Sequence, residues 1–391
     1  MEEWKEYKLR EIGRIVGGAT PPTKDSANYD GDISWITPKD LSNFTGRYIQ
    51  KGERSITQKG FESSSCQILP KGSILFSSRA PIGYIAIAAN ELCTNQGFKS
   101  IIPDNNLVNN LFLYYLLKYN KEEIEGLGSG TTFKEVSAKV MQNFDIKIPS
   151  IQTQKKIADI LSSLDDKIEL NRRINDNLEQ QAQVLFNHYF VDTPEILGDC
   201  TVGNLTDIAS YLNGLAMQKY RPTANDAGIP VLKIKELGQG KVDEHSDQCS
   251  ENIDSQYKVD NGDIIFSWSG TLMVKIWCGS ECGLNQHLFK VTSEKYPKWF
   301  YYFWTLHHLK KFIHIAQDKA VTMGHIKRSE LEKSEVLIPS NKKLIEIDKI
   351  ISPLLAKIIA LQTECRNLTA LRDTLLPKLM SGEVEINKIN N

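Results

Sequence analysis

The chain has 391 residues, of which 24% are charged and 41% hydrophobic, with 47 Lys and Arg against 48 Asp and Glu. This length is enough for two or three domains, and the composition excludes global disorder and any membrane helix, which needs roughly 18 consecutive apolar residues. A net charge of −1 gives no support by itself for nucleic-acid binding, so that a DNA contact would require basic residues gathered on one face. The absence of a signal peptide at Met1 and the seven scattered cysteines predict a cytoplasmic chain with reduced thiols.

The first predicted elements belong to a globular region of mixed structure. Short β-prone runs occupy residues 72–77 and 84–88, with a Pro-Gly turn region between them. Apolar and aromatic residues then recur at helical spacing near residues 108–119. Strands followed by a helix in this order predict an α/β domain.

A long helix is predicted after Ile148-Pro149-Ser150. Apolar positions recur in alternating steps of four and three, which is typical of the seam of a coiled coil. The seam positions are Ile157, Leu161, Leu164, Ile168, Asn171, Asn175, Leu178, Ala182 and Leu185. Two of them are asparagines, which indicate either a weakened, hydrated seam or a device that fixes the register.

The second globular region repeats the pattern of the first. Its β-prone runs occupy residues 262–267 and 272–277, and its helical cluster lies near residues 297–312. We expect the aromatic side chains of this helix to be in the core rather than on a base-stacking surface. These residues are Tyr301, Tyr302, Phe303 and Trp304.

A second long helix follows Ile338-Pro339-Ser340 and has a seam of the same phase. The positions are Ile347, Ile351, Leu354, Ile358, Leu361, Cys365, Leu368, Arg372 and Leu375. Pro353 departs from the pattern: either it kinks this helix, or Ser352 caps a new helix with Pro353 at its first position. The simplest arrangement pairs the two long helices in an antiparallel intramolecular coiled coil.

Matched residues confirm that the chain is an internal duplication. Early matches are separated by 196 positions, as for Gly18 and Gly214 or Lys39 and Lys235. From Gly72 onward the separation is 190 and stays constant into the long helices. Further matches are Leu9 with Leu205, Ile12 with Ile208, Leu41 with Leu237, Gly72 with Gly262, Asn95-Gln96 with Asn285-Gln286, and Thr132 with Thr322.

The predicted fold class is therefore α+β. It comprises two similar mixed α/β domains separated by two long antiparallel helices that form an intramolecular coiled coil, with pseudo-two-fold symmetry. The predicted segments are a first domain at 1–150, a central spacer helix at 151–192, a second domain at 193–340 and a C-terminal spacer helix with a tail at 341–391. Each seam spans about 43 Å at 1.5 Å per residue, comparable to one turn of B-DNA.

The order of these motifs resembles one known family, the specificity subunits of type I restriction–modification systems. The resemblance covers nearly the whole chain. It rests on Leu9-Arg10-Glu11-Ile12, the stretch from Gly72 to Gly83, Thr94-Asn95-Gln96-Gly97-Phe98, Gly128-Ser129-Gly130-Thr131-Thr132, Ile146-Lys147-Ile148-Pro149-Ser150 with the helix start that follows, and the ending from Leu375 to Glu383. The second copy departs from the pattern, with Ser269 in place of Arg79 and His325 in place of Glu135.

The resemblance implies a non-catalytic subunit that reads a bipartite, asymmetric target in double-stranded DNA. It implies that the helices act as a ruler between the half-sites and as the dock for two modification (adenine methyltransferase) subunits. Two ATP-dependent restriction subunits, which translocate and cleave DNA, would complete the complex. S-adenosylmethionine and ATP would be bound by those partners, and no cofactor or metal by this chain.

Candidate DNA-binding residues follow from the chemistry of phosphates and base edges. Lysine, arginine and hydroxyl side chains contact phosphates, while arginine reads guanine and Asn or Gln reads adenine. In the first domain the candidates are Lys39, Arg47, Arg79, Thr131 and Thr132. In the second domain they are Lys233, Lys235, Ser269, Thr271, Thr322 and His325.

Other conspicuous residues and motifs are not interpreted as functional sites. Gln96 and Gln286 occur in both copies although the half-sites should differ, which favours structural hydrogen bonding. Cys278 and Cys282 lack a second metal-ligating pair and are interpreted as free thiols. The Gly-rich loop before Thr131 lacks the Gly-Lys-Ser/Thr ending of a nucleotide-binding loop. Neither a nucleophile elbow nor a methyltransferase motif is found.

Two further function classes remain as alternatives. The chain could be an independent methyltransferase or nuclease, against which the missing motifs count. It could also be a coiled-coil scaffold or DNA-binding adaptor of a related modification system, which would leave the diverging domains without a role. Methylation by the isolated chain, and binding to random duplexes at high salt, are the observations that distinguish these alternatives.

Overall fold

A computed structural model of the chain describes residues 4–42, 44–130, 134–318 and 326–384. The chain divides into two compact units, and each is described by itself. The first unit contains residues 1–169 and 369–391, and the second contains residues 170–368. Both long helices therefore contribute a section to each unit. Among the described residues, no helix is long and apolar enough to cross a bilayer.

The first unit is built on three sheets. Strand order is β1-β10 in a two-stranded sheet, β2-β9-β6-β7-β4 in a five-stranded sheet and β5-β3-β8 in a three-stranded sheet. The strands are β1 (Lys5–Lys8), β2 (Gly13–Gly17), β3 (Tyr29–Ile36), β4 (Tyr48–Ile49), β5 (Ser55–Ile56), β6 (Ile74–Ser78), β7 (Ile82–Ala88), β8 (Cys93–Thr94), β9 (Lys99–Pro103) and β10 (Asp145–Ile148). Strands β6 and β7 confirm the two runs predicted from the sequence.

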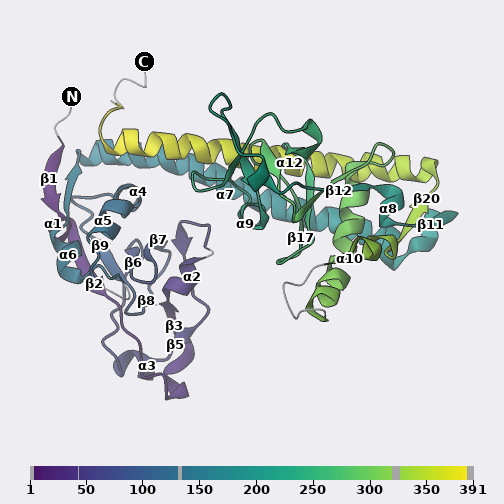
Figure 1. Ribbon diagram of the computed structural model, residues 1–391. Coiled ribbons are helices and arrows are strands. Elements are labelled where there is room, and N and C mark those ends of the chain that lie inside the picture. Colours follow the sequence, from purple (N-terminus) through teal and green to yellow (C-terminus); the bar gives the residue numbers. More distant parts are fainter. Residues whose placement is uncertain (1–3, 43, 131–133, 319–325, 385–391) are drawn as a thin grey trace. The chain divides into compact units, whose positions relative to one another are not determined.

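Helices cover the sheets of the first unit and join them to the long helices (Figure 1). The short helices are α1 (Leu9–Ile12), α2 (Pro38–Ser42), α3 (Gln58–Glu62), α4 (Asn110–Tyr119), α5 (Lys121–Gly126) and α6 (Ala138–Asn143). The amphipathic helix α4 packs Phe112 and Leu113 with Phe76 of β6 in the main core cluster, which also contains Ile157 and Leu161 of the long helix α7 (Ile151–Asn187). The globular domain is thus fused by apolar packing to the start of α7.

The second unit repeats this architecture. Its sheets have the orders β11-β20, β12-β19-β16-β17 and β14-β13-β18-β15. The strands are β11 (Cys200–Asn204), β12 (Ser210–Asn213), β13 (Ile229–Leu232), β14 (Gln248–Cys249), β15 (Lys258–Val259), β16 (Ile264–Ser267), β17 (Met273–Ile276), β18 (Cys282–Leu284), β19 (Leu288–Thr292) and β20 (Glu335–Pro339). The duplication predicted from the sequence is therefore confirmed: in both units the main sheet contains one hairpin, β6-β7 or β16-β17, whose first strand pairs with β9 or β19.

The helices of the second unit also correspond to those of the first. They are α8 (Leu205–Ile208), α9 (Ile234–Gln239), α10 (Lys298–Asp318), α11 (Arg328–Glu332) and the long helix α12 (Asn341–Met380). Tyr301, Phe303 and Trp304 of α10 are at most 5% exposed, and Tyr302 packs against the same core cluster. The prediction that these aromatic residues belong to the core is confirmed.

In both copies of the repeat, the matched glycine lies against the backbone of the matched Asn-Gln motif. A Cβ atom at Gly18 would lie 1.9 Å from the carbonyl oxygen of Asn95, and one at Gly214 would lie 2.3 Å from that of Asn285. Real Cβ atoms essentially never approach backbone so closely, so both positions require glycine. The Gly and Asn-Gln motifs recur together because each pair forms one close backbone crossing.

The long helices pair in antiparallel fashion within each unit. In the first unit, Arg372 of α12 bonds Asp165 of α7; in the second, Asn171 of α7 bonds Glu364 of α12 at 2.9 Å. Seam residues are buried or half-buried at every predicted position in both helices. The coiled-coil seam predicted from the heptad pattern is confirmed.

The seam contains two buried asparagines, and helix α12 contains a proline. Asn171 donates to Glu364, while the buried Oδ1 atoms of Asn171 and Asn175 have no hydrogen-bond partner among the described residues. Helix α12 continues without interruption from Asn341 through Pro353 to Met380, so the alternative in which Ser352 caps a new helix is wrong. The Ser352 hydroxyl instead donates to the Asp348 carboxylate one turn earlier.

Candidate nucleic-acid interface

The turn between β8 and β9 organises one edge of the first unit. The Asn95 side chain accepts a hydrogen bond from the Gly97 amide at 2.8 Å, and the Gly97 carbonyl accepts one from the Ser78 amide at 2.7 Å. The asparagine of the Asn-Gln motif therefore holds this turn by a side-chain hydrogen bond. Gln96 is exposed at the tip of the turn, where its amide oxygen accepts from the Thr20 hydroxyl.

Arg79 emerges beside this turn, immediately after β6. Its guanidinium lies 3.7 Å from the Glu135 carboxylate, which also pairs with Lys99 of β9 at 3.2 Å. Val136 donates to the Ser78 carbonyl, so the chain on either side of residues 131–133 is anchored next to Arg79. One carboxylate therefore faces two cations at the end of the main sheet.

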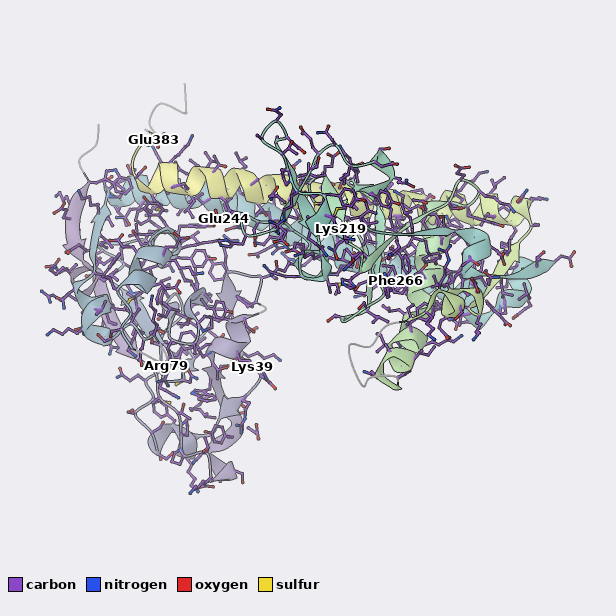
Figure 2. All side chains as sticks on the ribbon, in the orientation of Figure 1. Lys39, Arg79, Lys219, Glu244, Phe266 and Glu383 are labelled. Carbon is purple, nitrogen blue, oxygen red and sulfur yellow. The ribbon has the colours of Figure 1, made fainter. Side chains whose placement is uncertain are left out.

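Lys39 approaches the same edge from α2. Its neighbour Pro38 packs against the Gly97 turn, where a Cβ on Gly97 would meet the Pro38 ring at 2.8 Å. The Lys39 amine is 78% exposed and 2.6 Å from Glu53, a bond that raises the pKa of Lys39. We call this region, with Lys39, Arg79, Gln96, Lys99 and Glu135, the first loop edge; Figure 2 shows Lys39 and Arg79 far from the long helices within their unit.

The second unit forms a corresponding second loop edge on the same backbone framework. The Asn285 side chain accepts from the His287 amide, the His287 carbonyl accepts from the Trp268 amide, and Ile326 donates to the Trp268 carbonyl. The framework carries different side chains here. Ser269, which stands in place of Arg79, is 6% exposed, whereas Thr271 is exposed at the hairpin tip.

The candidate lysines of the second unit lie at the start of α9. Lys235 is exposed, and Lys233 pairs with Asp247, a hydrogen bond that lowers the pKa of this carboxyl group. Lys233 and Asn285 line a depression of about 330 Å³. Its other lining residues are Met217, Gln218, Arg221, Pro222, Val231, Asp247 and Gln248.

Sequence reasoning missed several polar residues at these edges. Lys99, Gln218, Arg221 and Gln248 all lie where the candidate residues gather, but none belongs to a matched motif of the repeat. The basic stretch from Lys219 to Arg221 before a proline was a weak signal of an exposed loop. Comparison of the two copies cannot detect residues that differ between them.

Arg47 lies elsewhere, against the long helix of its unit. The residue is 5% exposed; its Nε donates to Glu169 at 3.2 Å and its terminal nitrogen donates to Asp166. Burial by itself lowers the pKa of Arg47, but the neighbouring acidic groups more than offset this effect. A guanidinium held in this way is not displayed at the first loop edge, and the placement favours a structural role.

Four predicted residues lie outside the described part of the chain. They are Thr131, Thr132, Thr322 and His325. The described neighbours Gly130 and Lys134 in the first unit, and Ile326 in the second, belong to the segments that border the loop edges.

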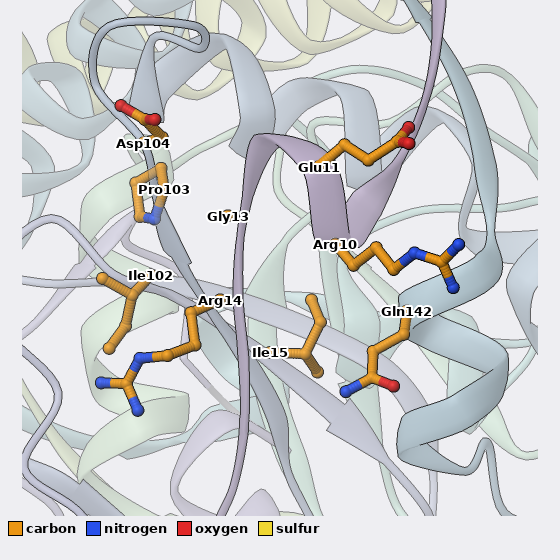
Figure 3. A pocket seen from close by; sticks show the side chains of 9 residues that line it. All are labelled: Arg10, Glu11, Gly13, Arg14, Ile15, Ile102, Pro103, Asp104 and Gln142. Atoms are coloured by element: carbon orange, nitrogen blue, oxygen red, sulfur yellow. The ribbon is translucent and has the colours of Figure 1, made fainter.

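A second depression lies at the opposite end of the main sheet of the first unit. It has a volume of about 500 Å³ and is lined by residues of α1, β2, β9 and α6, among them Arg10, Arg14 and Gln142 (Figure 3). Strand β2 pairs with β9 so that Gly17 faces Lys99 and Gly13 faces Pro103. The depression beside Gly13 is therefore separated from the first loop edge by the length of these strands.

In the described parts of the chain, no group of three or more His, Cys, Asp or Glu side chains is arranged to hold a metal ion. All seven cysteines are free thiols, including Cys278 and Cys282.

Comparison with known families identifies both halves of the chain. The family model described as "Type I restriction modification DNA specificity domain" matches residues 1–180 and again 198–369. The two matches coincide with the two copies of the repeat and together cover most of the chain.

Individual relatives match over the full length. The chain is 35% identical to the type I restriction enzyme MjaIX specificity subunit of Methanocaldococcus jannaschii, over 99% of this chain and 95% of that one. It is 23% identical to the HindI specificity subunit of Haemophilus influenzae, over 98% and 100%. The crystal structure of a type I system S subunit from M. genitalium superposes with a TM-score of 0.59 at 16% identity, over 97% and 96%, which shows a shared fold.

Proposed function

Because this chain belongs to the family of type I restriction–modification DNA specificity proteins, we propose that its two loop edges each read one half of a bipartite, asymmetric DNA target. The proposal goes beyond family membership, because it assigns the reading to particular surfaces and residues.

One observation carries the assignment: the two loop edges share a backbone framework and differ in the side chains that they display. Asn95 and Asn285 make the same turn, and Ser78 and Trp268 receive the same bonds from the segments beyond residues 135 and 325. Arg79 on the first framework corresponds to buried Ser269 on the second. A constant scaffold with divergent tips suits two domains that read different bases.

Lys39 and Arg79 of the first loop edge can exchange their carboxylate partners for groups of the DNA. Lys39 and Arg79 each pair with a carboxylate, and both pairs are substantially exposed. Exposed ion pairs are worth only about 0–1 kcal/mol, so a phosphate or a guanine edge can replace the carboxylate at low cost. We assign a phosphate contact to Lys39 and a base contact to Arg79.

The second loop edge offers a concave surface instead of a projecting arginine. The depression beside Lys233 presents the amides of Gln218 and Gln248 and the guanidinium of Arg221. Amide groups can bond adenine in two places, and an arginine can bond guanine in two places. We therefore extend the predicted set of the second domain by these three residues, with Lys233, Lys235 and Thr271 retained.

The partners follow from the proposed reading role. We propose that modification and restriction subunits assemble with this chain, and that S-adenosylmethionine and ATP are bound by those subunits. Two copies of each partner agree with a chain that itself contains two copies of one unit. The chain then contributes sequence recognition without a catalytic step of its own.

Selection from random DNA tests the proposed function. The native complex, isolated from its host through a tag on this chain, is mixed with a library of random-sequence duplexes, and the bound fraction is sequenced. We expect one motif with two dissimilar halves and a fixed gap, because each loop edge displays different side chains. Recovery of duplexes with no common motif, at a salt concentration that screens phosphate contacts, would support a scaffold instead.

Arg79→Gln sharpens this test at one residue. We expect the variant to relax selection at one or two positions of one half-site, with a loss of about 1–3 kcal/mol for the original base and no change in the other half. Lys147→Gln is the matched control, because Lys147 pairs with Glu6 on β1 at the other end of the domain. An unchanged motif in the Arg79→Gln complex would remove Arg79 from the reading set.

A further inference from the structure

One turn of helix α7 makes side-chain contacts with both the first globular domain and helix α12. The turn contains Asp165, Asp166 and Glu169, and all of their partners described here belong to the first unit. We call these three carboxylates with Arg47, Tyr115 and Arg372 the ionic clamp.

Asp165 joins three elements at once. Its Oδ2 accepts from the Tyr115 hydroxyl of α4 at 2.6 Å, and its Oδ1 accepts from Arg372 of α12 at 2.7 Å. Tyr115 is fully buried and Asp165 is 5% exposed. Burial, and then the charge of Asp165, raise the pKa of Tyr115, so its hydroxyl remains a hydrogen-bond donor at neutral pH.

Arg47 supplies the second arm of the ionic clamp. It leads into β4, the edge strand of the main sheet, and donates to Asp166 and Glu169 one turn apart. Two donors on one rigid guanidinium fix an orientation as well as a distance. The domain is therefore tied to α7 through two of its elements, helix α4 and the residue that leads into β4.

The second unit has no such clamp among its described residues at the corresponding positions. Leu355, Ala356 and Ile359 of α12 replace the three carboxylates. Leu355 and Ile359 pack in the apolar core, and Thr305, which replaces Tyr115, bonds Tyr211 and Tyr301 within its own domain. At these positions the contact is apolar and not directional, whereas the clamp's hydrogen bonds are. The second domain is tied to α12 at other positions, where Trp299 donates to Asp348 and Arg366 donates to the Gly279 carbonyl.

We infer that Arg47 and Tyr115 are positioning residues, which hold the first domain in one orientation on the helix pair and thereby set the gap at which its half-site is read. Arg47, Tyr115 and Asp165 are buried, whereas the Asp166 side chain is 66% exposed. Buried ionic groups contribute little net stability against apolar packing, and their attested use is to specify one arrangement among several. The inference rests on the proposed function, because a gap exists only for a split target.

The test compares gap preference in native complexes that contain wild-type chain, Arg47→Met or Tyr115→Phe. The probes are duplexes that contain the two half-sites selected by the wild-type complex, separated by gaps that vary over about one helical turn of 10 base pairs. We expect each variant to reduce the preference for the best gap over its neighbours by about tenfold, with both half-site sequences retained. Two variants that remove separate contacts to the same turn should give the same change.

Two further variants distinguish the loss of the clamp from misfolding and from the loss of a positive charge. Arg47→Lys keeps one ion pair and should recover part of the gap preference. Arg14→Met removes an equal charge from an exposed arginine that bonds neutral Gln67, and it should leave the preference intact. Tyr115→Phe keeps the ring that fills the core, so its complex should assemble even where that of Arg47→Met does not.

The contrary outcomes are distinct. If Arg47→Met weakens binding equally at every gap and lowers the salt slope by about one, Arg47 contacts a phosphate and the inference is wrong. An unchanged gap profile in both variants also overturns it. If the wild-type complex selects no split motif, the proposed function fails first, and that result is recognised before any variant is made.

Discussion

His308 illustrates how burial controls a single titratable group in the second unit. Its ring stacks on Trp304, with centroids 6.1 Å apart, and its Nε2 lies 2.8 Å from the Glu335 carbonyl oxygen. Burial lowers the pKa of His308 to about 4. The corresponding residue of the first unit is Lys118, whose pKa is also lowered, first by burial. Both copies thus place a half-buried basic group at the same position, where burial disfavours its charged form.

The shift at His308 predicts an acid-sensitive second unit. The unfolded chain binds a proton near the ordinary histidine pKa of 6.5, while the folded chain binds it only near 4. The unfolded state therefore holds more protons between these values, so this contribution to stability is complete above about pH 6.5 and is lost as the pH falls towards about 4. We expect His308→Gln, which keeps a donor and does not titrate, to lose less stability across this window.

Urea unfolding of the two full chains at about pH 7 and about pH 5 measures this difference. His307 remains in both chains, so its own lowered pKa cancels in the comparison. Equal losses in the two chains would show that another group governs the acid response.

The sequence predicted some of these residues and not others for identifiable reasons. Gly18 and Asn95 were visible because the same close crossing recurs in the second copy. The role of Arg47 was not visible, because its carboxylate partners lie about 120 positions later and face it only after folding. The candidate roles of Lys39, Arg79, Lys233, Lys235, Ser269 and Thr271 stay predictions, although the burial of Ser269 leaves its side chain little access to DNA.

The long helices show how far a periodic pattern determines an element. Heptad spacing was sufficient to predict both helices and their seam, since a stripe of apolar side chains must be covered. It did not predict the three- and four-stranded side sheets, whose strands β5, β8, β14 and β15 are each two residues long. Such short strands are held by their neighbours and carry no period of their own.

Asn175 provides a prediction about the seam. It is 5% exposed, and its Oδ1 has no hydrogen-bond partner in the described structure. Since an unsatisfied buried polar atom costs about 1–3 kcal/mol, Asn175→Leu should stabilise the chain by about 1–2 kcal/mol. The midpoint of urea unfolding measures the effect, with exposed Asn177→Leu on the same helix as the control. A destabilised Asn175→Leu chain would instead indicate that the asparagine selects the helix register.

At the scale of the whole chain, the duplication determines most of the architecture. Register differences of 196 and 190 residues in the sequence correspond to the matched strands and helices of the two units. The fold class was therefore predictable from the sequence by self-comparison. The divergent loop edges were not, because self-comparison detects only what the two copies share.

A matched lengthening of both helices tests the ruler. Seven residues added to α7 after Asn175, and seven to α12 after Leu361, keep the seam in phase because they are whole heptads. The addition lengthens the helix pair by about 10 Å, so the preferred gap should grow by about three base pairs. Duplex selection measures the gap and the half-sites together. Altered half-site sequences, or an unaltered gap, would contradict the ruler.

The ionic clamp and the apolar residues at the corresponding positions limit which recombinant chains, with a domain moved from one position to the other, can fold. A first domain transplanted to the second position would bring Arg47 and Tyr115 against Leu355, Ala356 and Ile359, and so bury a guanidinium without an acceptor. The reverse transplant would leave Asp165 without its tyrosine donor. Recombination junctions that carry residues 165–169 with the first domain avoid both mismatches, so the unit of exchange extends about five helical turns along α7, to residue 169, beyond the domain that reads DNA.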